Sequence, residues 1–317
     1  MSVNRHVAQT NFKSMKTIFS IASFVFYAIS IQAQDVKVQA GKVQHYENFA
    51  SQYVVPRHVD VWLPDSYNAQ TKYAVLYMHD GQMLYDSTTT WNKQEWGVDE
   101  TLTRLQKDKK IRNCIVVGIS NAGKLRHSEY FPQKPYESLT DYQKDTLSKA
   151  YRNKDTPLFV QSDKYLQFLV KELKPFIDKN FSTLKDRKNT FIAGSSMGGL
   201  ISVYAICEYP QIFGGAACLS THWVGVFRTE NNPIPAAFMR YLKTHLPNPK
   251  KHLLYFDYGT ATLDALYPPF QKQVDAIMKE KGYTDKNWLT KEFIGEDHSE
   301  RAWRKRLHIP FVFLLKK

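Results

Sequence analysis

The stretch "FIAGSSMGGL", residues 191–200, joins an apolar run, a glycine-framed serine pair and a second apolar run. It fits the pattern Gly-x-Ser-x-Gly in a single frame, with Gly194, Ser196 and Gly198 at the three specified positions. A frame centred on Ser195 would place alanine and methionine where the glycines are required. The pattern is typical of a strand that turns sharply into a helix and lifts a serine hydroxyl above the end of a sheet. We therefore predict that Ser196 is a catalytic nucleophile.

Strand-like and helix-like segments alternate along the chain. Apolar runs bounded by turn residues predict strands, and the run at 58–64 alternates apolar and polar residues as a half-exposed strand does. This alternation favours an α/β fold with a mostly parallel central sheet and helices on both faces. The expected strands are 58–64, 73–81, 113–120, 189–196, 214–220, 252–259 and 288–294, and the expected helices are about 94–107, 162–181, 197–209, 269–281 and 300–308.

The strands are spread evenly, so we expect one domain over residues 34–317. The stretch 125–160 interrupts the pattern because it is polar, rich in Tyr, Lys and Ser, and without a clear period. We interpret it as an insertion near the carboxyl edge of the sheet, where ligands bind in such folds. A surface loop without a role is the alternative.

The first 33 residues have the composition of an export signal. Lys13 and Lys16 precede the apolar run 18–31, and Ala33 offers a small residue at the cleavage point. The run is shorter than the ~20 apolar residues that a membrane span needs. We predict a signal peptide over 1–33, with Met15 as an alternative start, and a periplasmic or secreted protein without a stable membrane anchor.

The chain of 317 residues carries a formal net charge of +13. Basic residues form no long block, which argues against nucleic acid as a partner and leaves an anionic substrate or cell-envelope polymer open. The three cysteines, Cys114, Cys207 and Cys218, sit in apolar stretches and are expected to be buried. The usual metal-binding spacings of Cys and His are absent from the sequence, so we expect neither a metal nor another cofactor.

A serine nucleophile needs a base, which in this topology follows it in the chain. His298 lies just after the last expected strand and just before the last expected helix, where the base belongs. The other candidates, His245, His252 and His308, suit packing or solvent, and His222 is placed to line a pocket. We therefore predict His298 as the general base.

The acid that orients the base should follow the preceding strand. Asp264 lies in the loop beyond the turn at Gly259 and is the preferred candidate, because that loop should face the histidine. The sequence leaves Asp257, Glu296 and Asp297 open as alternatives.

The oxyanion of an acyl-transfer intermediate needs backbone donors. One is expected from Met197, the residue after the nucleophile, at a helix N-terminus whose dipole favours negative charge. The second is expected from the loop "HDGQ" at 79–82, where Gly81 permits close approach and Gln82 supplies the N–H. The aromatic residues Trp91, Trp96, Tyr130 and Trp223, together with His222, are candidate walls for an aromatic or sugar substrate, with core packing as the alternative.

These motifs resemble those of the esterase D-like esterases of the α/β-hydrolase superfamily, which are related to feruloyl, acetylxylan and siderophore esterases and to mycolyltransferases. The resemblance covers nearly the whole mature chain and is carried by "VWLP" at 61–64, "YMHDGQMLYD" at 77–86, "VVGISN" at 116–121, "EYFP" at 129–132, "IAGSSMGGL" at 192–200, "FDYGT" with "LD" at 256–264, and "DHSERAWRKRL" at 297–307. It implies Ser196 as nucleophile, His298 as base and the donors named above. The acid of the feruloyl branch best matches Asp264, whereas some siderophore esterases resemble a dyad without a clear acid. The "HDGQ" loop looks closer to the siderophore branch.

The sequence thus predicts an exported serine esterase that hydrolyses carboxylic esters, with acyl or feruloyl esters of polysaccharides as the expected substrates. A siderophore lactone of the enterobactin type is the first alternative. An acyltransferase with the same three groups, and a binding protein without catalysis, are rival functions of other classes.

Overall fold

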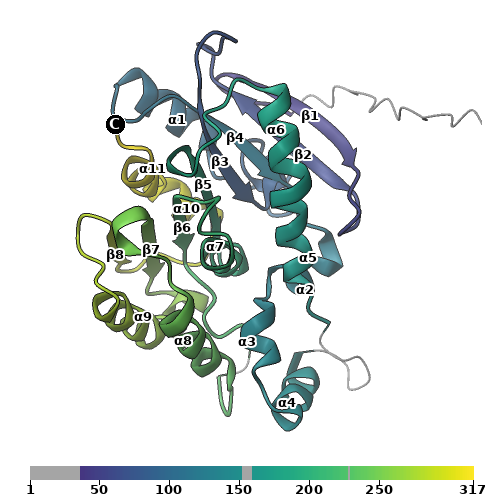
Figure 1. The fold of residues 1–317 in the computed structure, drawn as a ribbon, viewed down its shortest axis with the longest axis vertical. Helices are drawn as coiled ribbons and strands as arrows, with labels where there is room; N and C mark the ends of the chain where they lie inside the picture. The colour runs from purple at the N-terminus through teal and green to yellow at the C-terminus, as the bar shows by residue number, and fades with distance from the viewer. Residues whose placement is uncertain (1–35, 152–158, 228) are drawn as a thin grey trace, which may run out of the picture.

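A computed structural model describes residues 36–151, 159–227 and 229–317, and the export signal expected at 1–33 lies outside this part. Eight strands form one sheet in the order β1-β2-β4-β3-β5-β6-β7-β8 (Figure 1). The pairs β1–β2 and β2–β4 are antiparallel, and the other neighbours are parallel. The strands are β1 (Lys42–Phe49), β2 (Arg57–Leu63), β3 (Ala74–His79), β4 (Cys114–Ile119), β5 (Thr190–Ser195), β6 (Gly215–Leu219), β7 (Leu253–Gly259) and β8 (Trp288–Phe293).

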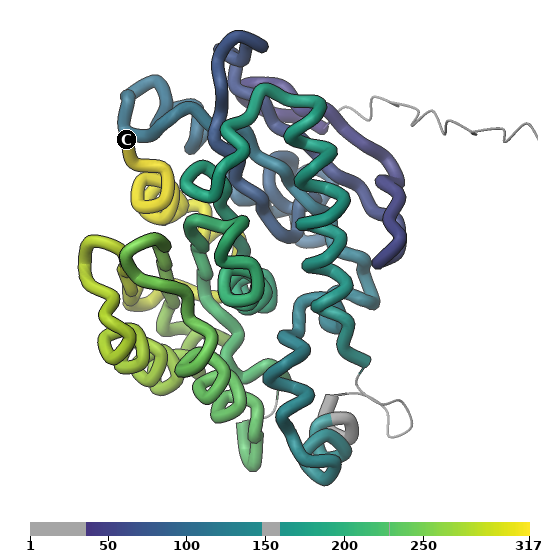
Figure 2. Tube along the Cα trace, in the orientation of Figure 1, coloured from purple at the N-terminus to yellow at the C-terminus, as the bar shows by residue number. Residues whose placement is uncertain are grey.

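Helices connect the parallel strands, which confirms the predicted α/β-hydrolase fold. Within the expected insertion at 125–160, three short helices appear where no period was evident, and Figure 2 shows α3 and α4 extending away from the sheet. The strand β1 and the helix α8 were not predicted. The helices are α1 (Val98–Lys107), α2 (Arg126–Tyr130), α3 (Gln133–Glu137), α4 (Asp141–Tyr151), α5 (Ser162–Gln167), α6 (Lys174–Asn180), α7 (Met197–Glu208), α8 (Ile234–His245), α9 (Pro268–Glu280), α10 (Glu300–Arg306) and α11 (His308–Leu315).

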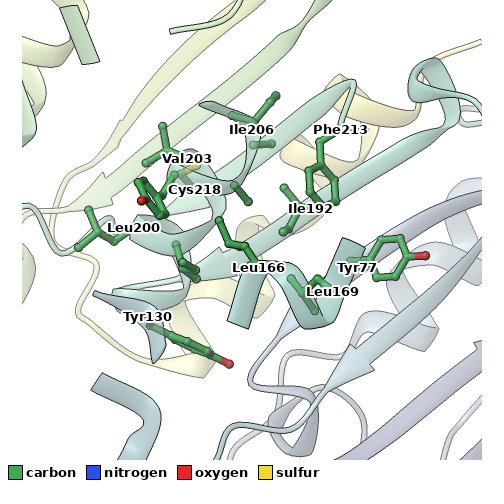
Figure 3. Close-up of a cluster of buried hydrophobic side chains, with 14 of the residues drawn as sticks. Tyr77, Tyr130, Leu166, Leu169, Ile192, Leu200, Val203, Ile206, Phe213 and Cys218 are labelled. Atoms are coloured by element: carbon green, nitrogen blue, oxygen red, sulfur yellow. The ribbon is translucent and has the colours of Figure 1, made fainter. Parts of the chain in front are cut away.

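The central strands are buried on both faces, as parallel strands covered by helices must be. On one face, Tyr77 and Ile192 pack in a large apolar cluster with side chains of the α5 region such as Leu166, and of α7 such as Val203 (Figure 3). On the other face, Leu76 and its neighbours pack with α1, α10 and α11. Apolar burial on both sides holds the strand ends rigidly, and the strand ends carry the candidate site.

The strand β2 is buried rather than half-exposed, which corrects the expectation from its alternating pattern. Its polar residues His58 and Asp60 face a cavity of about 180 Å³, which is also lined by His45, Tyr85 and Gln82. Nδ1 of His45 lies 2.6 Å from Oδ1 of Asp60, across the antiparallel pair. The alternation therefore reflects a polar hollow that is partly open to solvent, and not a fully exposed face.

The His45–Asp60 pair predicts a pH dependence of stability. The hydrogen bond to Asp60 raises the pKa of His45, although burial opposes the shift. The stabilisation is therefore fully present below the unfolded-state pKa of about 6.5 and is lost as pH rises through the higher folded-state pKa. We expect the difference in unfolding free energy between wild type and Asp60→Asn to shrink as pH rises from about 5 to about 9. Urea denaturation across this range measures it, and a difference that stays constant would contradict the assignment.

All three cysteines are buried, as predicted, and none of them forms a disulfide. Among the described residues, no helix combines the length and the apolar character needed to cross a membrane.

Candidate active site

Ser196 occupies the turn between β5 and α7 with a backbone that few residues adopt. Its φ is 58° and its ψ is −122°, a conformation that costs roughly 1–3 kcal/mol and persists only where the surroundings enforce it. Two backbone hydrogen bonds do so: the N–H of Ser196 donates to the carbonyl of Leu219 at 2.9 Å, and its carbonyl accepts from the N–H of His222 at 3.2 Å. Glycine is required at 194, because a Cβ there would lie 2.7 Å from the carbonyl carbon of Gly198.

Ser196 and His298 line the same pocket, although 102 positions separate them in the chain. The pocket has a volume of about 620 Å³ and lies at the carboxyl end of the parallel strands. His298 belongs to the loop between β8 and α10, and its ring packs edge-on against Trp303 with the centroids 5.0 Å apart. The structure therefore brings the predicted nucleophile and the predicted base to one pocket.

Asp264 is the carboxylate that contacts the histidine. Its Oδ1 lies 2.5 Å from Nδ1 of His298, and the side chain is fully buried. Its Oδ2 accepts hydrogen bonds from the Ser220 hydroxyl and from the Gly259 N–H, both at 2.6 Å. A buried carboxylate that is satisfied on both oxygens can hold an imidazole in one tautomer and stabilise its protonated form.

The loops that carry Asp264 and His298 meet very closely. A Cβ at Gly259 would lie 2.1 Å from the carbonyl oxygen of Glu296, so only glycine permits this approach. The N–H of His298 also donates to Oγ1 of Thr262 at 2.9 Å. These contacts fix the distance between the acid and the histidine.

The three alternative acids have other partners. Asp257 is buried and accepts from Nη2 of Arg306 and from the Tyr255 hydroxyl, both at 2.9 Å. Burial raises the pKa of Asp257, and Arg306 acts in the opposite direction. The other two carboxylates form ion pairs with exposed cations: Glu296 with Lys305, and Asp297 with Arg301.

The expected oxyanion donors lie beside the nucleophile. Met197 is the first residue of α7, where an N–H has no partner within its own helix, and it lines a neighbouring hollow together with Ser196. Gln82 lines the main pocket. At Gly81 a Cβ would lie 2.6 Å from the Gly118 carbonyl carbon, so glycine permits close packing of this loop on β4.

Arg126, which sequence reasoning missed, brings a cation to the pocket wall. Its Nε and Nη2 donate to the two carboxylate oxygens of Asp80 at 2.7 and 2.8 Å, and Asn121 donates to the same carboxylate. Burial alone would raise the pKa of Asp80, but Arg126 and Asn121 hold it below its usual value. The pair joins the loop at 79–82 to the start of the insertion, which therefore does reach the pocket.

His79 and Asp80 do not form a metal site with their neighbours. His79 is fully buried, its Nδ1 lies 2.8 Å from the Tyr165 hydroxyl, and burial lowers its pKa to about 3. Across the described ranges, no three His, Cys, Asp or Glu side chains are grouped so that they could hold a metal ion.

Three of the five candidate wall residues line a space that Ser196 also lines. Trp91 and Trp96 line the main pocket, Trp91 with 84% of its surface exposed and Trp96 almost buried. His222 lines the neighbouring hollow of about 210 Å³ beside Ser196. Tyr130 and Trp223 line neither space, which corrects their assignment: both rings are buried in the core, where aromatic packing is the stronger demand.

Tyr267 is a second residue that sequence reasoning missed. Its hydroxyl lies 2.8 Å from Nδ1 of His222, and its ring packs edge-on against His298. Burial raises the pKa of Tyr267 and lowers that of His222 to about 3, so both side chains stay neutral near pH 7. Its position three residues after Asp264 is the only signal in the sequence.

The strand order and the helical connections are those of an α/β-hydrolase fold. A family model described as "Putative esterase" matches residues 54–309, and the chain belongs to this family. Among curated relatives, the uncharacterized protein YbbA of Bacillus subtilis (strain 168) is 25% identical over 169 residues, which cover 53% of this chain and 58% of that protein. The chain thus spans less than two thirds of the length of the curated relatives it matches.

Solved structures share the fold at low identity. A ferulic acid esterase superposes with a TM-score of 0.60 and 18% identity, covering 87% of this chain and 98% of that one. The ferric enterobactin esterase of Salmonella typhimurium superposes with a TM-score of 0.62 and 15% identity, covering 88% of this chain and 59% of that one.

Proposed function

We propose that the protein is a serine hydrolase of carboxylic esters. The observation that carries the proposal is the contact of 2.5 Å between His298 and the buried Asp264, in the pocket that Ser196 also lines. A serine, a histidine and a carboxylate together can carry out acyl transfer without a cofactor.

In the proposed mechanism, Oγ of Ser196 attacks the ester carbonyl while Nε2 of His298 takes the hydroxyl proton. Asp264 holds the imidazole by Nδ1 and stabilises its charged form. The backbone N–H groups of Met197 and Gln82 bind the oxyanion. His298 then protonates the leaving alcohol, and a water molecule activated by the same histidine cleaves the acyl-enzyme.

The proposed substrates are acyl or feruloyl esters of polysaccharides, and the proposed location is the periplasm or the outside of the cell. The fold shared with a ferulic acid esterase supports this substrate class, as does the exposed Trp91 at the pocket wall, which suits an aromatic acid or a sugar ring. A siderophore lactone is the second candidate, because Arg126, paired with Asp80 of the "HDGQ" loop, lines the same pocket and the fold is shared with an enterobactin esterase.

A substrate panel tests the proposal. Acetyl, feruloyl and cyclic siderophore esters are offered to the wild type, and the released acid is measured by chromatography with and without a sugar alcohol as acceptor. We expect free acid as the main product and the highest kcat/KM on feruloyl esters. Transfer to the sugar acceptor in preference to water would identify an acyltransferase, and no turnover of any ester would contradict an enzymatic role.

A further inference from the structure

A second large hollow lies at the amino ends of the parallel strands, opposite the end at which Ser196 lies. It has a volume of about 540 Å³, and its walls come from the segments that precede β4, β5, β6, β7 and β8. Because these strands are parallel, their amino ends gather at this edge, whereas Ser196 follows the carboxyl end of β5. The six residues of β5 separate the two sites by about 20 Å at the usual rise of a strand.

The lining of this hollow is strongly basic. Half of its fourteen lining residues are lysine or arginine, and the lining contains neither aspartate nor glutamate. In the described part of the chain, none of these cations forms an ion pair with a carboxylate. The carboxylate of the neighbouring Asp186 accepts hydrogen bonds from the backbone N–H of Lys188 and from the side-chain amide of Asn189. The seven cations are Arg112, Arg187, Lys188, Lys250, Lys251, Lys286 and Lys316.

Both arginines hold neighbouring segments together through hydrogen bonds, so the lysine ammonium groups are the charges available to a ligand. Arg112 donates to the carbonyl of Lys316 at 2.6 Å and to the side-chain oxygen of Asn189 at 2.7 Å. Arg187 donates to the carbonyl of Lys251. The lysine side chains at 188, 250, 251 and 286 are exposed. The hollow thus presents separate ammonium charges from several loops. Neither arginine guanidinium is free to bind one phosphate through two parallel hydrogen bonds.

Ammonium groups spread over a concave surface match single negative charges spaced along a flexible polymer. A lipid surface fits less well, because the large exposed apolar side chains, such as Trp91, Phe227 and Ile294, lie outside this hollow. We propose that the hollow is a docking site for an acidic polysaccharide, which binds through its uronate carboxylates. Docking there leaves the pocket of Ser196 open, so the protein can hold a polymer while its pocket acts on another part of it. The proposal concerns binding alone and stands whether or not the esterase proposal holds.

The test compares two charge-reversed variants of the full chain. The triple variant Lys188→Glu, Lys250→Glu, Lys251→Glu alters the hollow. The matched control Lys164→Glu, Lys272→Glu, Lys291→Glu replaces three exposed lysines elsewhere and changes the net charge by the same amount. Binding to polygalacturonate, neutral xylan, duplex DNA and anionic phospholipid vesicles is measured by co-sedimentation or interferometry at low and high salt.

We expect salt-sensitive binding of the wild type to polygalacturonate and not to neutral xylan. The hollow variant should bind roughly 10- to 100-fold more weakly, at about 0.5–1 kcal/mol for each lost exposed contact, whereas the control stays within about threefold of wild type. Both variants should hydrolyse a small soluble ester as the wild type does. Equal weakening in both variants, no binding at low salt, or tighter binding to DNA or vesicles than to polygalacturonate would overturn the proposal.

Discussion

Replacing Ser196 with alanine is expected to lower kcat for ester hydrolysis by roughly 10⁴- to 10⁶-fold, because the nucleophile of a cooperating set accounts for nearly all of the set's effect. The substitution removes one oxygen atom and leaves a Cβ at the same strained φ of 58°, so the fold should persist. Steady-state kinetics on the best ester of the panel measures the loss, and thermal unfolding confirms that the variant is folded.

The adjacent serine supplies the matched control. Ser195 is the last residue of β5, is nearly buried and touches the same pocket. Ser195→Ala should keep kcat within a few-fold of wild type, on the order of the effect of a lost weak hydrogen bond. A large loss in Ser195→Ala with activity kept in Ser196→Ala would show that the wrong frame of the motif had been chosen.

Replacing Asp264 with asparagine is expected to lower kcat by about 10⁴-fold, since an amide at this position favours the wrong tautomer of the histidine. The contact of 2.5 Å to Nδ1 of His298 is the reason for choosing this carboxylate. The measurement is kcat and KM from pH 5 to pH 9, and the loss should fall on kcat.

Asp257→Asn distinguishes a catalytic acid from a structural one. It would remove the carboxylate that lies 2.9 Å from the buried Arg306 guanidinium and leave Asp264, at 4.0 Å, as the remaining ion-pair partner; breaking a buried ion pair costs about 3–5 kcal/mol of stability. We therefore expect a lower unfolding temperature but nearly normal kcat for each folded molecule. If Asp257→Asn lost kcat at unchanged stability while Asp264→Asn kept it, the assignment of the acid would be reversed.

Chain order and local pattern were sufficient to predict the groups that lie at strand ends. Ser196 was identifiable because its turn requires glycine at 194, a demand that the short contact to Gly198 explains. His298 and Asp264 follow the last two strands of the sheet, so the order of elements placed them in the same region. Their contact depends on the close approach at Gly259, which no local pattern encodes.

The residues that sequence reasoning missed act through tertiary contacts alone. Arg126 starts a short helix in a stretch without a period, and only the fold brings it to Asp80. The same reason applies to Tyr267, which meets His222 across 45 positions of sequence. The strand β2 was wrongly predicted to be half-exposed, because polar side chains that line a hollow give the same alternating pattern as solvent exposure.

Covalent labelling tests most directly whether Ser196 is an activated nucleophile. A fluorophosphonate is a phosphoryl electrophile that reacts with activated serines, and peptide mass spectrometry locates the adduct. We expect one adduct per chain on Ser196, none in Ser196→Ala, and much slower labelling in Asp264→Asn. An adduct on Ser195 or elsewhere, or a folded wild type that is never labelled, would contradict this expectation.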